Sequence, residues 1–311
     1  MSARSTDTAK QSAYFRLIKL PTMKSSADLS SPRIAWDHFA DPESGLSAKK
    51  KLQLRILVFV AHPDDETIGA SSLMSRVADV SVIFLTDGAP HDPCFWSPDA
   101  KGTREDYAQM RWHEATAATA LVNISPERIL CLGGVDQDAI QGLPVLVPRF
   151  VELLREQQPD IVVTHPYEGG HPDHDTAALM AHLGAKKLVR GGHKSPVIVE
   201  MTSYHLRDSR CVTGEFLATN GASPPELAVE LSLEEQEIKK KMIECYHSQR
   251  LVLEAYPLSA ERFRLAPEYD FSRPPHPGKL WYECLRWPIT GERWRELAVE
   301  AVTQCHEAAW A

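Results

Sequence analysis

Five short apolar runs stand out in the pattern of hydrophobic and polar positions along the chain. Each run is rich in β-branched residues and is nearly continuous, without the alternation of a strand that has one face in water. Such runs are typical of strands that are buried on both faces of a parallel sheet. They cover residues 54–61, 80–87, 128–133, 160–166 and 196–204.

Between these runs, apolar residues recur at the spacing of amphipathic helices. The alternation of strand and helix predicts an α/β fold with a Rossmann-like, doubly wound and mostly parallel sheet that has helices on both faces. In sheets of this kind, ligands bind beyond the carboxyl ends of the strands. The predicted helices cover residues 67–78, 104–122, 145–157 and 176–188.

The two flanks of this core have a different pattern. The first fifty residues are rich in Ser, Thr, Ala and charge and show no sustained period, which indicates an arm that packs on the body. Beyond Tyr204, a loop leads to a charged helix with a capping box at Ser232 and Glu235, and an amphipathic helix covers 292–308. We therefore predict an arm at 1–50 and a single domain at 51–311, with a core at 54–204 and a C-terminal extension at 205–311.

Composition narrows the classes of function. The formal net charge of -8 argues against a broad electrostatic grip on nucleic acid or an anionic membrane, so a small-molecule substrate is favoured. No run reaches the roughly 18 apolar residues of a membrane span, and the N-terminus lacks the apolar core of a secretory signal. The six cysteines are far apart and form no CxxC motif, which favours reduced thiols. We expect a cytoplasmic protein, compatible with a homo-oligomer.

Two clusters of ligand-type side chains follow the first and the fourth apolar run. The stretch FVAHPDDETIG carries His62, Asp64, Asp65 and Glu66. The stretch VVTHPYEGGHPDHD carries His165, His171, Asp173, His174 and Asp175. In each cluster, two side chains able to bind a metal lie three residues apart around a proline, which biases the residue before it toward extended backbone. Read alone, HPDD is also compatible with a polar turn and a helix cap.

Both clusters are expected at the same edge of the sheet, so together they predict a shared metal site. Two histidines and one carboxylate with an open coordination position are typical of a catalytic zinc. Fe²⁺ or another divalent metal suits the same ligands. Glu66 is expected either to orient a ligand histidine or to favour the N-terminus of the next helix.

The AHPDDE block, joined to HPDH about a hundred residues later, resembles the LmbE-like or PIG-L family of zinc-dependent N-deacetylases. Members of this family remove acetyl groups from molecules that contain N-acetylglucosamine, and the resemblance covers about residues 56–188. It implies that Zn²⁺ is bound by His62, Asp65 and His174. It also implies that Asp64 is the general base that activates the metal-bound water for attack on the amide carbonyl, and that His171 assists at the oxyanion or the leaving amine.

The resemblance further implies contacts with the substrate. Arg111, in the block RWHEA, matches a family helix whose arginine faces the substrate, although an i,i+3 surface pair with Glu114 is the alternative. Asp87 and Asp136 occupy strand ends that contact sugar hydroxyls in the family, with a simple turn role as the alternative for both.

One position departs from the family pattern. Some members place a tyrosine two residues before the first histidine of HPDH, and here that position is Gly169. The nearest tyrosine is Tyr167. Either Tyr167 reaches the reacting centre, or the oxyanion relies on the metal and His171 alone.

The expected function is therefore zinc-dependent removal of an acetyl group from an N-acetylated amino sugar. One alternative is a metal-dependent amidase that cleaves a different acyl group or a thiol conjugate. Another is a non-catalytic sugar-binding module. A nucleotide-binding version of that module would need a glycine-rich turn after the first strand, where this chain has HPDDETIG.

Overall fold

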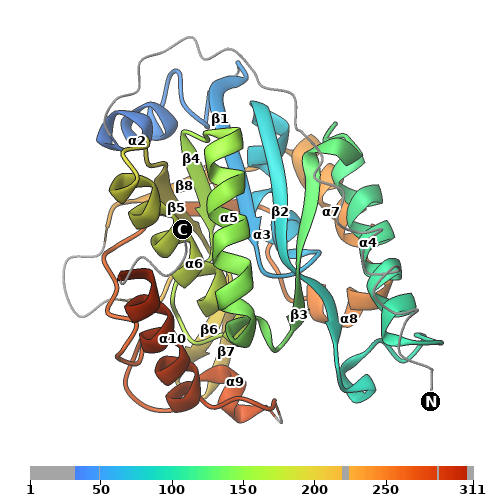
Figure 1. Cartoon of the computed structure of the whole chain (residues 1–311). Helices are drawn as coiled ribbons and strands as arrows, with labels where there is room; N and C mark the ends of the chain where they lie inside the picture. Colours follow the sequence, from blue (N-terminus) through green and yellow to red (C-terminus); the bar gives the residue numbers. More distant parts are fainter. Residues whose placement is uncertain (1–31, 49, 219–223, 286, 307–311) are drawn as a thin grey trace, which may run out of the picture.

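The computed structural model describes residues 32–306 except 49, 219–223 and 286. Most of the predicted arm and the end of the last predicted helix lie outside the described residues. The centre is a seven-stranded sheet in the order β3-β2-β1-β4-β5-β9-β8 (Figure 1). Its strands are β1 (Leu52–Val60), β2 (Val77–Pro90), β3 (Ile129–Asp136), β4 (Ile161–Thr164), β5 (Val197–Met201), β8 (Glu226–Glu230) and β9 (Ala260–Leu265).

Strands β1 to β5 pair in parallel, which confirms the predicted fold class. The chain moves outward from β1 through β2 to β3 and then returns to place β4 on the other side of β1. The gap between β1 and β4 is thus the topological switch point, where the crossovers on either side diverge and leave room for a ligand.

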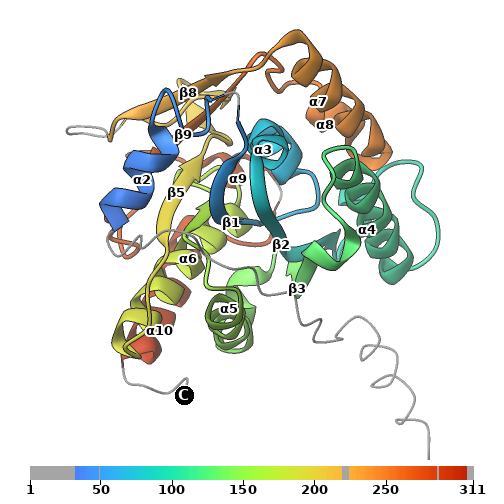
Figure 2. The same ribbon diagram turned by 90° about the horizontal axis from the view of Figure 1, so that it is seen from above.

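Helices cover both faces of this sheet (Figure 2), and this is why the strands read as continuous apolar runs. In β1, Ile56 and Val58 join the core on one face, while Leu57 and Phe59 join the core on the other. One face packs against α2 (Pro32–Ala40), α3 (Asp65–Arg76), α4 (Arg104–Ala120) and α7 (Leu233–Cys245), and the other against α5 (Leu143–Gln157), α6 (Pro172–Arg190) and α10 (Gly291–His306).

Two helices begin earlier than their apolar pattern predicts. Helix α3 begins at Asp65, and α6 begins at Pro172, whose fixed φ and missing N–H suit a first helical position. As a result, Asp65 and His174 belong to first helical turns rather than to loops.

The extension contributes more to the sheet than its sequence indicates. Strands β9 and β8 add to the edge of β5 in antiparallel pairing, and β6 (Tyr204–Arg207) and β7 (Arg210–Thr213) form a separate hairpin. The extension also contains two short α-helices, α8 (Arg250–Leu253) and α9 (Trp281–Cys284). The capping box predicted at Ser232 and Glu235 is confirmed at the start of α7.

The described part of the arm packs on the body through α2. Trp36 and Phe39 are buried in the core, and the ring of Phe39 meets Phe263 of β9 edge-on at 5.7 Å. How the chain divides into domains stays a prediction. Among the described helices, none is long and apolar enough to span a bilayer.

Candidate metal centre

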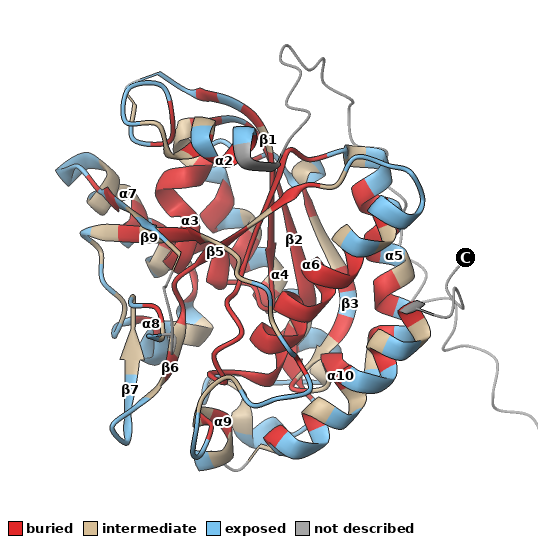
Figure 3. Ribbon diagram, turned by 90° about the vertical axis from the view of Figure 1, so that its left-hand side faces the viewer, coloured by how far each residue is buried: buried red, intermediate tan, exposed pale blue. Residues whose placement is uncertain are grey.

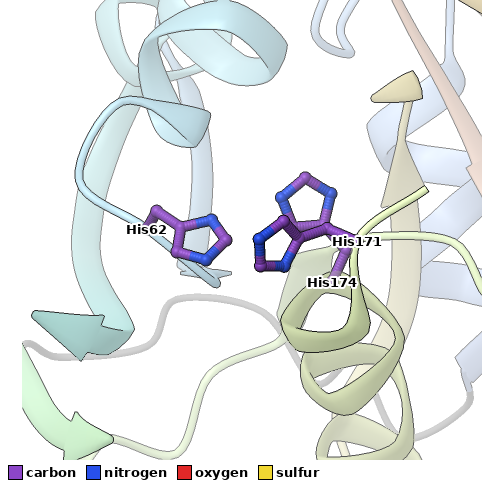
Figure 4. A group of neighbouring side chains, drawn as sticks. All are labelled: His62, His171 and His174. Carbon is purple, nitrogen blue, oxygen red and sulfur yellow. The ribbon is translucent and has the colours of Figure 1, made fainter. Parts of the chain in front are cut away.

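The two predicted clusters meet at the switch point. The loop after β1 carries His62, and the loop and first turn after β4 carry His171 and His174 (Figure 4). The two loops are also linked directly, because the backbone N–H of Ala61 donates to His165 Nε2 at 3.1 Å. The parallel pairing of β1 and β4 thus brings side chains about a hundred residues apart in the sequence into contact.

Asp65 lies at the centre of this cluster. Its Oδ2 is 3.3 Å from His62 Nδ1 and 3.3 Å from His165 Nε2, and its Oδ1 is 3.3 Å from His174 Nε2. The His62 backbone N–H donates to the same carboxylate at 2.7 Å, which closes the turn. His62 and His174, two of the three side chains expected to bind metal, therefore converge on the carboxylate of the third, Asp65.

The structure places further donors beside them. Three groups of side chains each have donor atoms within 4.8 Å of one another. They are His62, His171 and His174; Asp65, His165 and His174; and His62, Asp136, His171 and Asp173. The sequence placed His165 and Asp173 in the second cluster but gave them no role. Asp173 also accepts from the backbone N–H groups of Gln137 and Ala139, so it ties the end of β3 to the start of α6.

The electrostatics of Asp65 and His174 suit a cation, whereas, against the effect of burial, Asp136 raises the pKa of His62 well above its usual value. Burial, together with the neighbouring His165, lowers the pKa of His174 to about 3, so this imidazole is neutral. Although burial opposes ionisation, His174 and His165 hold the pKa of Asp65 well below its usual range. Neutral imidazole and ionised carboxylate are the protonation states that a divalent metal requires of its ligands.

Two details support this fit. Asp136 Oδ1 is buried 3.2 Å from His62 Nε2, yet it accepts no well-formed hydrogen bond from the described residues, so a bound cation would satisfy it. Ser203 Oγ lies 3.0 Å from His174 Nδ1, which leaves Nε2 for the metal. The donor set therefore fits a divalent metal ion.

Asp64 has an unusual backbone conformation, with φ 139° and ψ -29°. Its side chain makes no capping hydrogen bond to α3, so the helix-cap interpretation is wrong for this residue. Neighbouring groups hold the conformation: Arg111 donates to the Pro63 carbonyl at 2.5 Å and to Asp64 Oδ2 at 3.0 Å, and Glu66 Oε2 accepts from the Asp64 N–H at 3.0 Å. Burial raises the pKa of Asp64 to about 6, against the opposing charge of Arg111.

The structure gives the surroundings of two expected substrate contacts. Arg111 is only 2% exposed, so its i,i+3 pair with Glu114, at 3.8 Å, is buried rather than at the surface, and its guanidinium donates to Pro63 and Asp64. Its contact with a substrate stays a prediction. The ring of Tyr167 is buried and stacks on Trp294 at 5.3 Å, and its hydroxyl donates to the Arg273 carbonyl at 2.8 Å. Tyr167 therefore does not reach the reacting centre.

The remaining candidates divide into two kinds. Asp87 accepts from the Ala89 N–H within its own turn and from Arg104 at 2.6 Å, so it has a turn role, and a sugar contact stays a prediction. Asp136 instead joins the histidine cluster. Its contact with a sugar hydroxyl also stays a prediction.

Glu66 supports the loop of Asp64 rather than a ligand histidine. Besides the Asp64 N–H, it accepts from the hydroxyl of Tyr246 at 2.5 Å, and burial raises its pKa to about 7. Tyr246 follows α7 in the extension and was not foreseen from the sequence, because it lies 180 residues from Glu66. The extension therefore helps to build the site.

His171 has a defined tautomer. Its Nδ1 accepts from the Asp173 N–H at 3.1 Å, so the neutral ring carries its proton on Nε2. Nε2 lies 3.6 Å from Asp136 Oδ1, and burial beside His62 and His174 lowers the pKa of His171 well below its usual value. His171 is therefore a neutral hydrogen-bond donor next to the expected metal ligands.

The fold and this buried donor set define a class: a doubly wound α/β protein with a candidate metal centre at the switch point of its sheet. Residues 57–183 match the model of the PIG-L family, described as GlcNAc-PI de-N-acetylase. Residues 57–183 thus resemble a PIG-L (LmbE-like) family domain, which confirms the expected resemblance.

Curated relatives match part of the chain. The 1D-myo-inositol 2-acetamido-2-deoxy-alpha-D-glucopyranoside deacetylase 1 of Saccharopolyspora erythraea is 30% identical over 166 residues, which are 43% of this chain and 54% of the relative. The corresponding deacetylase of Salinispora arenicola is 31% identical over 153 residues, 41% of this chain and 49% of the relative. This chain thus spans about half the length of the curated relatives that it matches.

Solved structures share the fold. The N,N'-diacetylchitobiose deacetylase of Pyrococcus horikoshii superimposes with a TM-score of 0.50 at 18% identity, over 86% of this chain and 94% of that one. A deacetylase of the teicoplanin biosynthesis pathway gives a TM-score of 0.51 at 16% identity, over 68% of this chain and 96% of that one. At these identities the likeness concerns the fold alone.

Proposed function

We propose that this protein is a zinc-dependent N-deacetylase that removes the acetyl group from a small N-acetylated amino sugar. The observation that carries the proposal is the position of Asp64, a carboxylate fixed by Arg111 next to the donor set of Asp65, His62 and His174. The curated relatives named above are deacetylases of a 2-acetamido sugar, which supports the same substrate class.

His62, Asp65 and His174 would hold the metal. When bound, zinc supplies a Lewis acid that acidifies water and polarises an amide carbonyl. Asp64 is the proton acceptor: Arg111 holds its Oδ2, while its Oδ1 accepts no hydrogen bond from the described residues and is free to take a proton. With this backbone conformation, the Asp64 side chain makes no capping bond to the helix.

His171 acts as the hydrogen-bond donor of the site. Its Nε2–H, fixed by the backbone bond to Nδ1, stabilises the negative oxygen that develops when the amide carbonyl is attacked. An amine is a poor leaving group until it is protonated, so the proton taken up by Asp64 is returned to the nitrogen as the C–N bond breaks. Gly169 supplies no phenol here, which leaves His171 as the donor from this loop.

We also propose that residues 51–311 form one domain. The support is structural: β8 and β9 extend the core sheet, and Tyr246 reaches back to Glu66.

The test is acetate release from a panel of N-acetylglucosaminides by the purified protein, with and without a chelator, and after addition of Zn²⁺ or Fe²⁺. We expect activity that a chelator removes and zinc restores. Asp64→Ala should keep the bound metal and lose acetate release, and near-normal turnover in that variant would refute the role of Asp64. Substrates with longer acyl groups on the same sugar separate a deacetylase from a broader amidase.

A further inference from the structure

A strap from the C-terminal extension crosses the start of α6. We define the strap as residues 280–294, of which 286 is not described. At one end the Trp281 N–H donates to the Gly169 carbonyl at 2.9 Å. At the other end Trp294 Nε1 donates to the Pro172 carbonyl and to Thr176 Oγ1, both at 3.0 Å, where α10 packs against α6 (Figure 3). Both ends are thus fixed to the segment that carries His171.

The middle of the strap is also braced. Glu283 accepts from the Leu280 N–H at 2.9 Å through one carboxylate oxygen and from the Gly291 N–H at 2.8 Å through the other. The ring of Trp287 lies on His171, with 4.3 Å between ring centroids and 58° between ring planes. The strap therefore holds an indole ring directly beside the proposed hydrogen-bond donor.

Core packing does not account for Trp287. Trp294 on the same strap is 0% exposed and its Nε1 is hydrogen-bonded, as expected of a tryptophan in a core. Trp287 is half-buried, and its indole N–H donates to none of the described residues. A partly open aromatic face beside buried polar groups is typical of ligand sites, because it offers a large apolar area with little loss of side-chain entropy.

The position of the indole indicates what it contacts. In the proposed mechanism His171 acts at the amide, so a ring tilted against it lies next to the substituent of the amide nitrogen. In an N-acetylated amino sugar that neighbour is the pyranose ring, which presents C–H groups on one face and is uncharged. An uncharged, partly apolar face is complementary to an aromatic surface.

We propose that Trp287 is the specificity-determining residue that selects a sugar ring over an acyclic amine substituent. This inference rests on the proposed function. The indole of Trp287 packs on the apolar face of the pyranose while His171 faces the amide. The family match ends at residue 183, so this contact comes from the part of the chain outside it.

The experiment compares two substrates, a disaccharide of N-acetylglucosamine and an N-acetylated acyclic amine. Trp287→Ala should lower the ratio of kcat/KM for the sugar to kcat/KM for the acyclic amide by about tenfold, the size of a good aromatic contact. Trp287→Phe should recover most of that ratio. Leu285→Ala, at a residue 36% exposed on the same strap, is the matched control and should leave the ratio unchanged.

A binding measurement separates this inference from the proposed function. In an Asp64→Ala background, calorimetric titration with the disaccharide should show about tenfold weaker binding when Trp287→Ala is added. An equal loss on both substrates, or no loss in the titration, would overturn the inference. If the wild-type protein released acetate from neither substrate, the proposed function would fail, and the titration would still decide whether Trp287 binds the sugar.

Discussion

The ion pair between Lys239 of α7 and Glu261 of β9 provides a sharp test of how the extension is joined to the core. Both side chains are 0% exposed, and Lys239 Nζ lies 3.0 Å from Glu261 Oε1 and 2.7 Å from the Ile68 carbonyl of α3. Glu261 also accepts from the side chains of Ser71 and Ser72. Replacing Lys239 with Met removes the cation and leaves a buried carboxylate without its counter-charge.

The expected loss is large. Removing one member of a buried ion pair costs about 3–5 kcal/mol, because the remaining charge loses its partner without regaining water. With a urea dependence of about 3 kcal/mol per molar, the midpoint of unfolding should fall by about 1 M or more. Adding Glu261→Gln should restore part of that loss, since a neutral amide still bonds to the two serines.

Urea unfolding followed by circular dichroism measures these midpoints. The matched control is Lys241→Met on the same helix, where the pair with Glu237 spans 3.7 Å between two side chains that are more than half exposed. Such a pair contributes little. If Lys239→Met shifted the midpoint no further than Lys241→Met, the reasoning about burial would be wrong. Two separate unfolding transitions would contradict the single-domain proposal.

Three further predictions follow from other parts of the structure. Burial raises the pKa of Glu200 to about 7 despite the facing charge of Arg264. The protonated carboxyl group therefore stabilises the fold fully below the pKa of an unfolded glutamate, and this contribution is lost as the pH rises through about 7. In urea unfolding at a series of pH values, the unfolding free energy of the wild type minus that of Glu200→Gln should therefore fall between about pH 4.5 and pH 7, and a constant difference would contradict it. Gly169 (φ +70°) and Gly192 (φ +71°) both have a backbone conformation in which alanine would be strained, but a Cβ at Gly169 would also lie 2.7 Å from Leu280 while Gly192 has open space. Gly169→Ala should thus lower the melting temperature more than Gly192→Ala, and equal losses would show that the strap does not press on this loop. Added zinc should raise the melting temperature of the wild-type protein by mass action and leave His174→Ala unchanged, and an equal rise in both would place the metal elsewhere.

Sequence patterns predicted the core strands because the apolar residues within each strand are also the residues that are buried in the fold. Strands β1 to β5 are apolar on both sides, so their burial is visible without knowing what covers them. Strand β9 was missed because Glu261 and Arg264 are charged residues at buried positions. Their partners, Lys239 and Glu200, lie 22 and 64 residues away, and no local pattern reveals such a pairing.

The candidate site shows the same division. His62, Asp65 and His174 could be found because a proline and a three-residue spacing mark them within each loop. The orientations of Tyr167 and Arg111 were not foreseen, since they depend on partners from distant segments. These partners are Trp294 in one case, and the Pro63 carbonyl with the Asp64 carboxylate in the other. The histidine spacing is a local property, whereas the direction of a buried side chain is a property of the whole fold.

The left-handed backbone at Asp64 has a consequence for how this domain can change over evolutionary time. At φ 139° only glycine is free of steric strain, so the carboxylate is kept at a conformational cost of about 1–3 kcal/mol. Asp64→Gly should therefore unfold at a higher urea concentration than Asp64→Ala while releasing no acetate. For a domain no longer selected for catalysis, glycine is the most stable replacement, so a glycine between the proline and the second aspartate of this motif would mark a relative that has kept the fold and lost the reaction.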